Sequence, residues 1–170
     1  MKHLFLAILL LFPIVVFGQH SHAPAKEAAP ATLEVGLGDI NHPVSTNNPE
    51  AQKFFNQGLA YVYAFNHEEA VRSFQQAATL DPDCAMAYWG VALALGPNIN
   101  MDVDPAREKL AYEAIQKALP LAAKVSEPER AYIQAMARRY SNDPKADLKK
   151  LNLDYKNAMS EVARDRKSVV

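Results

Sequence analysis

The chain has 170 residues, of which 49% are hydrophobic, and this is enough apolar material for one domain with a continuous core. Its 18 basic and 19 acidic residues give a net charge of -1, so no overall field favours nucleic acid or an anionic membrane surface as a partner. The single cysteine, Cys84, excludes an internal disulfide and a cysteine-rich metal site.

Residues 1–18 have the pattern of a secretory signal peptide. Lys2 and His3 precede an unbroken apolar run that ends at the small residue Gly18. The run is shorter than the roughly 20 residues that span a bilayer, and no cysteine near its end offers a site for lipid attachment. We expect the segment to be removed and the mature protein to be periplasmic or secreted without a membrane anchor; a retained anchor is the less favoured alternative.

Residues 19–44 are expected to form a disordered or extended linker. From Gln19 to Ala31 the chain is rich in Ala, Pro, His and Ser and has no apolar periodicity. Leu33 to Val44 contains spaced apolar residues and is expected to lie extended against the first helices. His20 and His22 offer a weak copper or zinc site together with the new amino terminus, but a polar linker without metal is the favoured interpretation, and no cofactor is expected.

Residues 45–164 predict one helix after another. Each expected helix opens with a side chain that can accept the free amide hydrogens of a first turn. Six such starts are present, the last of them opening a helix that runs to about Ala163: Asn48 with Pro49, Asn66, Asp83, Asp104 with Pro105, Ser126 with Glu129, and Asp143 with Pro144. Short connections between helices favour antiparallel neighbours.

The helical region also repeats. An offset of 34 residues (85 minus 51) aligns Ala51, Phe54, Phe55, Leu59 and Ala60 with Ala85, Tyr88, Trp89, Leu93 and Ala94. Within the first unit, large, small and aromatic residues and a closing proline alternate in a fixed order: Phe54, Gly58, Tyr61, Ala70, Phe74, Ala77 and Pro82. This pattern resembles the tetratricopeptide repeat. Small residues in such a pattern allow the backbones of two antiparallel helices to approach closely.

The resemblance implies an all-α fold in which antiparallel helix hairpins stack as a solenoid of about three repeats. The second unit keeps Tyr88 and Ala92 on its first helix, and a weaker third unit follows. The strings Ala87-Tyr88-Trp89-Gly90, Arg130-Ala131-Tyr132-Ile133 and Arg139-Tyr140-Ser141 are similar to those of large exported bacterial tetratricopeptide proteins and imply no known activity. The alternative is an alanine-rich six-helix bundle without true repeats.

In proteins with this repeat, ligands usually lie in a concave groove that the first helix of each hairpin lines. The matching positions here are mostly apolar: Phe55, Leu59, Tyr63, Trp89 and Leu93. The resemblance therefore implies a protein or peptide partner with an apolar segment. The alternative, slightly favoured over an open groove, is that the segment from Leu33 to Val44 or further repeats cover this surface.

The other motifs in the sequence indicate neither a metal site nor a catalytic site. The loop from Asn98 to Asp104 alternates oxygen-bearing and apolar side chains like a calcium loop, but it lacks the turn glycine and has Lys109 where the bidentate glutamate belongs. No nucleophile, phosphate-loop or zinc-helix motif is present in the sequence. We interpret Cys84 as a packing residue and expect no enzymatic activity.

Residues 165–170 lack a cap or a turn signal, and solenoids normally end in a polar capping helix. This segment can be back-translated into a sequence that resembles a synthetic adapter, so we expect a non-native tail; an ordinary basic tail is the alternative. The favoured function is an exported scaffold that binds a partner protein through a groove. The alternative function is that of an accessory module of a longer envelope enzyme or metal-handling protein.

Overall fold

A computed structural model describes residues 30–99 and 104–167. Within these ranges the protein is all-α, as predicted, with six α-helices and one short 3₁₀ helix. They are α1 (Pro49–Tyr63), α2 (His67–Leu80), α3 (Ala85–Leu95), α4 (Pro105–Ala118), the 3₁₀ helix η1 (Leu119–Lys124), α5 (Glu127–Ala137) and α6 (Leu148–Lys167). The expected signal peptide and the two histidines His20 and His22 lie outside the described residues.

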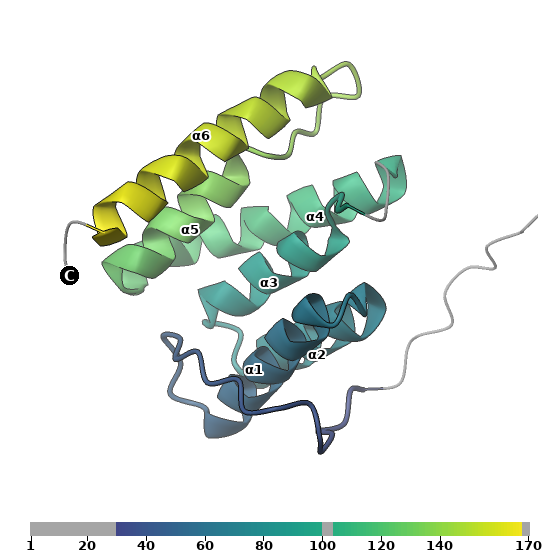
Figure 1. Ribbon diagram of the computed structural model, residues 1–170, viewed down its shortest axis with the longest axis vertical. Helices are drawn as coiled ribbons and strands as arrows, with labels where there is room; N and C mark the ends of the chain where they lie inside the picture. Colours follow the sequence, from purple (N-terminus) through teal and green to yellow (C-terminus); the bar gives the residue numbers. More distant parts are fainter. Residues whose placement is uncertain (1–29, 100–103, 168–170) are drawn as a thin grey trace, which may run out of the picture.

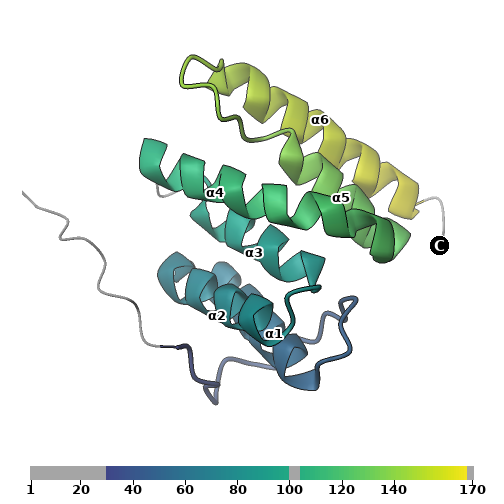
Figure 2. The same ribbon diagram turned by 180° about the vertical axis from the view of Figure 1, so that it is seen from behind.

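The helices pack in consecutive pairs, α1 with α2, α3 with α4, and α5 with α6. Figures 1 and 2 show the pairs following one another along the long axis of the molecule. α3 contacts both helices of the first pair and also α5, and most of its residues are buried. It is therefore the central element of the core.

Four of the predicted helix starts are confirmed, and they begin where a side chain satisfies the first amide hydrogens. The Oδ1 atom of Asn48 accepts from the N–H of Glu50 at 2.9 Å, and Asn66 caps α2. Asp104 caps α4 through the N–H of Ala106 at 2.8 Å. Ser126 and Glu129 form the predicted capping box of α5.

Two predicted helix starts are wrong. α3 begins at Ala85 rather than after Asp83 and has no side-chain cap, because the carboxylate of Asp83 accepts from Lys124 Nζ at 3.2 Å instead of from the first turn. α6 begins at Leu148 rather than after Asp143. The carboxylate of Asp147, which the sequence interpretation overlooked, accepts from the amides of the first turn at 3.0 and 3.1 Å. α6 also continues to Lys167, through residues that were expected to interrupt it.

Small residues let the first two pairs approach closely. Phe74 of α2 is 0% exposed and lies between two glycines. A Cβ atom at Gly58 of α1 would lie 2.5 Å from Phe74 Cε1, and a Cβ atom at Gly90 of α3 would lie 2.5 Å from Phe74 Cδ1. The ring therefore occupies space that only glycine leaves free in both neighbouring helices.

The positions singled out for repeat packing are mostly in this core. Pro82 lies exposed in the turn between α2 and α3, and the half-buried Tyr88 donates to its carbonyl oxygen at 3.3 Å. The others are buried: Phe54, Gly58, Tyr61, Ala70, Phe74, Ala77 and Ala92.

Candidate peptide-binding surface

The residues proposed to line a groove differ in how exposed they are. Phe55 is 0% exposed, with its ring centroid 6.0 Å from that of His42 and 5.4 Å from that of Phe74. Leu59 is also buried. Leu93 is half-buried, and Tyr63 is 70% exposed. Of these residues, Tyr63 and Leu93 are therefore the more accessible to a partner.

Trp89 connects the second and third helix pairs. Its side chain is buried in the core cluster, and its ring centroid lies 5.8 Å from that of Tyr132 on α5. Replacing Trp89 would therefore disturb the packing of α3 against α5 as well as any binding surface.

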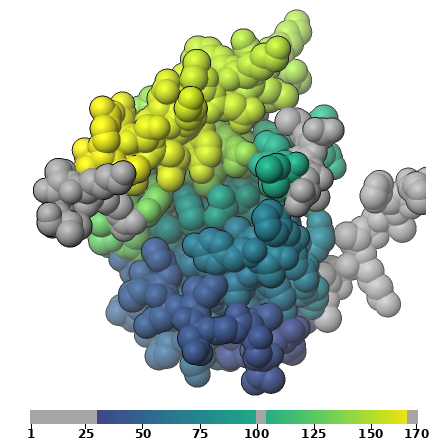
Figure 3. All heavy atoms as spheres, in the orientation of Figure 1, coloured from purple at the N-terminus to yellow at the C-terminus, as the bar shows by residue number. Residues whose placement is uncertain are grey.

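Residues 31–44, called the arm below, lie on the outer side of α1. Their path is visible in Figure 1, and their atoms, purple to dark blue, lie at the surface in Figure 3. Leu37, Ile40 and Val44 pack against the core. Gly36 and Gly38 have φ angles of 87° and 84°, a left-handed conformation that glycine adopts without strain, and they bend the arm around the helix.

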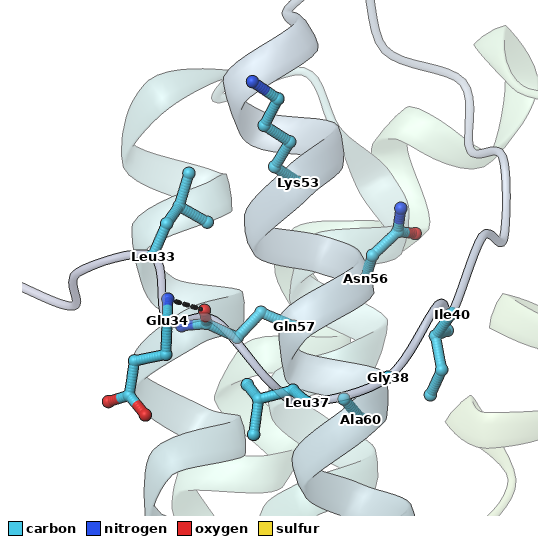
Figure 4. Close-up of a pocket in the computed structure, with 9 residues that line it drawn as sticks. All are labelled: Leu33, Glu34, Leu37, Gly38, Ile40, Lys53, Asn56, Gln57 and Ala60. Carbon is cyan, nitrogen blue, oxygen red and sulfur yellow. Dashed lines mark hydrogen bonds between the residues drawn. The ribbon is translucent and has the colours of Figure 1, made fainter.

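Gln57 of α1 holds the first part of the arm. Its Oε1 atom accepts from the N–H of Glu34 at 2.8 Å, and its Nε2 atom donates to the carbonyl oxygen of Thr32 at 2.9 Å. Figure 4 shows this side chain reaching the arm. Nε2 also donates to the hydroxyl of the fully buried Ser73 at 3.1 Å. The amide of Gln57 is thus fixed by α2 and faces the main chain of the arm.

Gln52 repeats the arrangement five residues earlier on α1. Its Oε1 atom accepts from the N–H of Val44 at 2.9 Å, and its Nε2 atom donates to the carbonyl oxygen of His42 at 2.8 Å. Asn56 adds a third amide, whose Oδ1 atom accepts from the N–H of His42 at 3.2 Å and from Gln52 Nε2 at 3.0 Å. The three amides therefore bind main-chain atoms of extended residues.

A pocket of about 270 Å³ remains between the arm and α1. Its walls come from arm residues and from the α1 residues that face them, as Figure 4 shows: Leu33, Glu34, Leu37, Gly38, Ile40, Lys53, Asn56, Gln57 and Ala60. At its edge Glu34 lies against the hydroxyl of Tyr61, and burial together with this carboxylate raises the pKa of Tyr61 to about 12. The arm therefore covers α1 without filling the space beneath it.

The residues that follow the arm are fixed more firmly. The N–H of Ser45 donates to the buried carboxylate of Glu129 on α5 at 2.7 Å. The hydroxyl of Thr46 donates to Asp81, and Asn48 Nδ2 donates to the carbonyl oxygen of Leu80 at 3.0 Å. These contacts tie the chain just before α1 to the ends of two other helices.

The described residues outside this surface offer little reactive chemistry. Cys84 is 0% exposed, and burial raises the pKa of its thiol to about 11. In the part of the calcium-like loop that is described, Asp104 serves as a helix cap. In residues 30–99 and 104–167, no group of three or more His, Cys, Asp or Glu side chains lies close enough to hold a metal ion.

Comparisons with protein families, with curated proteins and with solved structures give no match to this chain. In the described part of the chain, no helix is both long enough and apolar enough to cross a membrane.

Sequence reasoning missed the three amides of α1. Gln57 carried a usable signal, because it occupies a buried position between Phe54 and Tyr61 on the apolar side of the helix. A glutamine at such a position needs hydrogen-bond partners for its amide. Those partners come from the arm, whose path could not be derived from periodicity.

Proposed function

We propose that the chain is a tetratricopeptide-type interaction module of an exported scaffold, and that it binds an extended, partly apolar segment of a partner protein. The observation that carries the proposal is the pairing of Gln52 and Gln57 with the main chain of the arm. α1 thus holds an extended segment already, and hydrogen bonds to the main chain give affinity while side-chain pockets give selectivity.

The repeat assignment is supported by the equivalent burial of three of the five aligned pairs, whereas Tyr88 and Leu93 are half-buried and their counterparts Phe54 and Leu59 are buried. Ala51 and Ala85 are both 0% exposed, and the aromatic residues Phe55 and Trp89 are both buried. Their helices, α1 and α3, are the first members of consecutive antiparallel pairs and contact each other. Export is supported by the apolar leader pattern of the first eighteen residues.

A displayed library of unstructured peptides tests the proposal. We expect the protein to select peptides with apolar residues, and Tyr63→Ala and Leu93→Ser to weaken their binding about tenfold or more, because these two side chains are the more accessible ones on the first helices. Lys156→Ala on the exposed side of α6 is the control and should bind unchanged. Failure to select any peptide, or equal loss in the control, would reject the proposal.

A further inference from the structure

Gln57 is an unusual polar group for the core of a helix pair. It is 7% exposed, and Ser73 beside it is 0% exposed. A buried side-chain amide is costly unless both its oxygen and its nitrogen are hydrogen-bonded. Ser73 satisfies only one of the two N–H groups, and main-chain atoms of Thr32 and Glu34 satisfy the rest. The amide is therefore oriented to receive a carbonyl oxygen and an N–H group two residues apart.

Gln52 binds the same pair of main-chain groups at His42 and Val44. Because both glutamines bind atoms that every extended peptide presents, their hydrogen bonds do not depend on the side chains of the arm. The side chains of the arm contribute by packing, because Leu37 and Ile40 lie against the core. Another extended segment with apolar residues at similar spacing could make the same contacts.

The two ends of the arm are held to different degrees. After Val44 the chain is tied to Glu129, Asp81 and Leu80. Before Ile40 the arm is held by the two hydrogen bonds to Gln57 and by the packing of Leu37 against the core. The rest of this part is exposed: Leu33 is 44% exposed, Val35 is 98% exposed, and added Cβ atoms at Gly36 and Gly38 would meet nothing within 4 Å. Residues 31–41 can therefore leave α1 without breaking the contacts at Ser45 and Thr46.

We propose that residues 31–41 are an exchangeable occupant of the Gln57 site, and that an extended partner segment binds by replacing them. The partner's main chain pairs with Gln57, and its apolar side chains take the places that Leu37 and Ile40 occupy against the core. This inference rests on the proposed function, for which it names the binding site and the kind of ligand. Gln57 loses both main-chain partners when the arm leaves, and the incoming segment supplies them again.

A fluorescein-labelled synthetic peptide with the sequence of residues 31–41 tests the exchange. We would measure its binding by anisotropy to the full chain, to a chain with Leu33→Ser and Leu37→Ser in its own arm, and to that chain with Gln57→Met added. The weakened arm competes less with the peptide, so we expect the Leu33→Ser, Leu37→Ser chain to bind the peptide about tenfold more tightly than the unchanged chain. Adding Gln57→Met should reverse this gain in affinity. A scrambled peptide keeps the main chain but loses the apolar spacing, so it should bind more weakly than the peptide of residues 31–41.

Equal binding to the first two chains, with unchanged helix content by circular dichroism, would overturn the inference. If the substituted chain loses helix content, amide exchange in the unchanged protein decides. The Glu34 amide, which bonds to Gln57, should then exchange at least about 100-fold faster than the Val91 amide in the core of α3, since the arm opens locally. Equal exchange rates would show that the arm leaves only on global unfolding, and the inference fails.

The two proposals can fail separately. If library peptides bind but do not compete with the labelled peptide of residues 31–41, the exchange at Gln57 is wrong and the interaction module stands. If the labelled peptide binds at Gln57 while no library peptide does, the site binds its own arm only, and the proposed scaffold function is wrong.

Discussion

Ser45 and Glu129 lie 84 residues apart in the sequence, and the N–H of Ser45 donates to the Glu129 carboxylate at 2.7 Å. The hydroxyl of Ser45 donates to the same carboxylate, as do the N–H and hydroxyl of Ser126, at 3.0 and 2.6 Å. Glu129 is 6% exposed. This cluster connects the segment before α1 to the start of α5, and so joins the first helix pair to the third.

Acid is expected to weaken this connection. Burial by itself raises the pKa of Glu129, but hydrogen bonds from Ser126 and Ser45 outweigh burial and hold that pKa below its ordinary value. A carboxyl group with a lower pKa in the folded chain contributes stability above its unfolded pKa of about 4.3, and the contribution is lost as the pH falls through the folded pKa. We expect Glu129→Gln to lower the free energy of unfolding by about 1–3 kcal/mol at pH 7.

Urea unfolding at pH 7 and at about pH 2.5 measures the effect, because the contribution of the ionised carboxylate is complete at pH 7 and falls once the pH is below the unfolded pKa. The difference between the wild type and Glu129→Gln should shrink at the lower pH. Glu127→Gln, an exposed neighbour on α5, is the control and should change stability little. A difference of the same size at both pH values would contradict the role of the ionised carboxylate.

Alanine is expected to be harmful at both glycines that face Phe74. Alanine improves helix propensity by about 1 kcal/mol, but its Cβ atom would lie 2.5 Å from the Phe74 ring at either position. Because Phe74 is fully buried, the ring cannot move away freely. We expect Gly58→Ala and Gly90→Ala each to lower the free energy of unfolding by about 1–3 kcal/mol, by overpacking.

A double-mutant cycle with Phe74→Leu identifies the cause. If the clash with the ring is responsible, Gly58→Ala should destabilise the Phe74→Leu chain by clearly less than it destabilises the wild type in urea unfolding. Additive losses would mean that the glycine acts elsewhere, and a Gly58→Ala chain as stable as the wild type would contradict the packing described.

Phe65 is expected to be a destabilising residue. It has a φ angle of 59°, a conformation that glycine favours, and its N–H donates to Val62 at 3.1 Å while Asn66 donates to Tyr61 at 2.9 Å. These two bonds close α1 with a Schellman motif in which Phe65 takes the glycine position. Its side chain is 61% exposed, so little packing is lost on removal. We expect Phe65→Gly to be more stable than Phe65→Ala by about 1 kcal/mol.

Thermal or urea unfolding of the two variants checks this directly. The comparison of glycine with alanine removes the aromatic ring in both and leaves the backbone conformation as the difference. Equal stability of the two variants would show that residue 65 does not keep the left-handed conformation.

Cys84 is expected to resist thiol reagents in the folded protein. Its thiol is fully buried, and burial raises its pKa to about 11, so little thiolate is present at pH 8. We expect its reaction with a disulfide reagent such as DTNB to be at least about 100-fold slower in buffer than in denaturing urea. Ser160→Cys on α6 supplies a matched thiol near the surface, and fast reaction of Cys84 in the folded chain would contradict its burial.

The sequence predicted the helical class and most helix starts because these depend on local chemistry. Asn48, Asp104 and the pair of Ser126 and Glu129 act as caps within a few residues of their positions, so their roles follow from spacing alone. The start after Asp143 was wrong because two aspartates compete, and Asp147 lies nearer to the apolar stripe of α6.

The candidate binding surface could not be predicted from the sequence, because it depends on contacts between distant segments. Glu129 was predicted as a cap, yet its bond to Ser45 spans 84 residues and no local pattern indicates it. Apolar spacing placed Phe55 and Leu59 on a shared side of the helix, but that side is buried in the core, where Phe55 lies against Phe74 of α2. The position of Gln57 indicates that its amide needs partners, but only the structure identifies them as main-chain atoms of Thr32 and Glu34.

The most direct measurement is an NMR titration of the isotope-labelled chain with a peptide selected from the library. Binding of extended main chain in place of residues 31–41 should shift the side-chain amide resonances of Gln57 in a saturable way and should speed the exchange of the Glu34 amide. A peptide that binds saturably while the Gln57 resonances and the Glu34 amide stay unchanged would contradict the assignment of the binding site to α1.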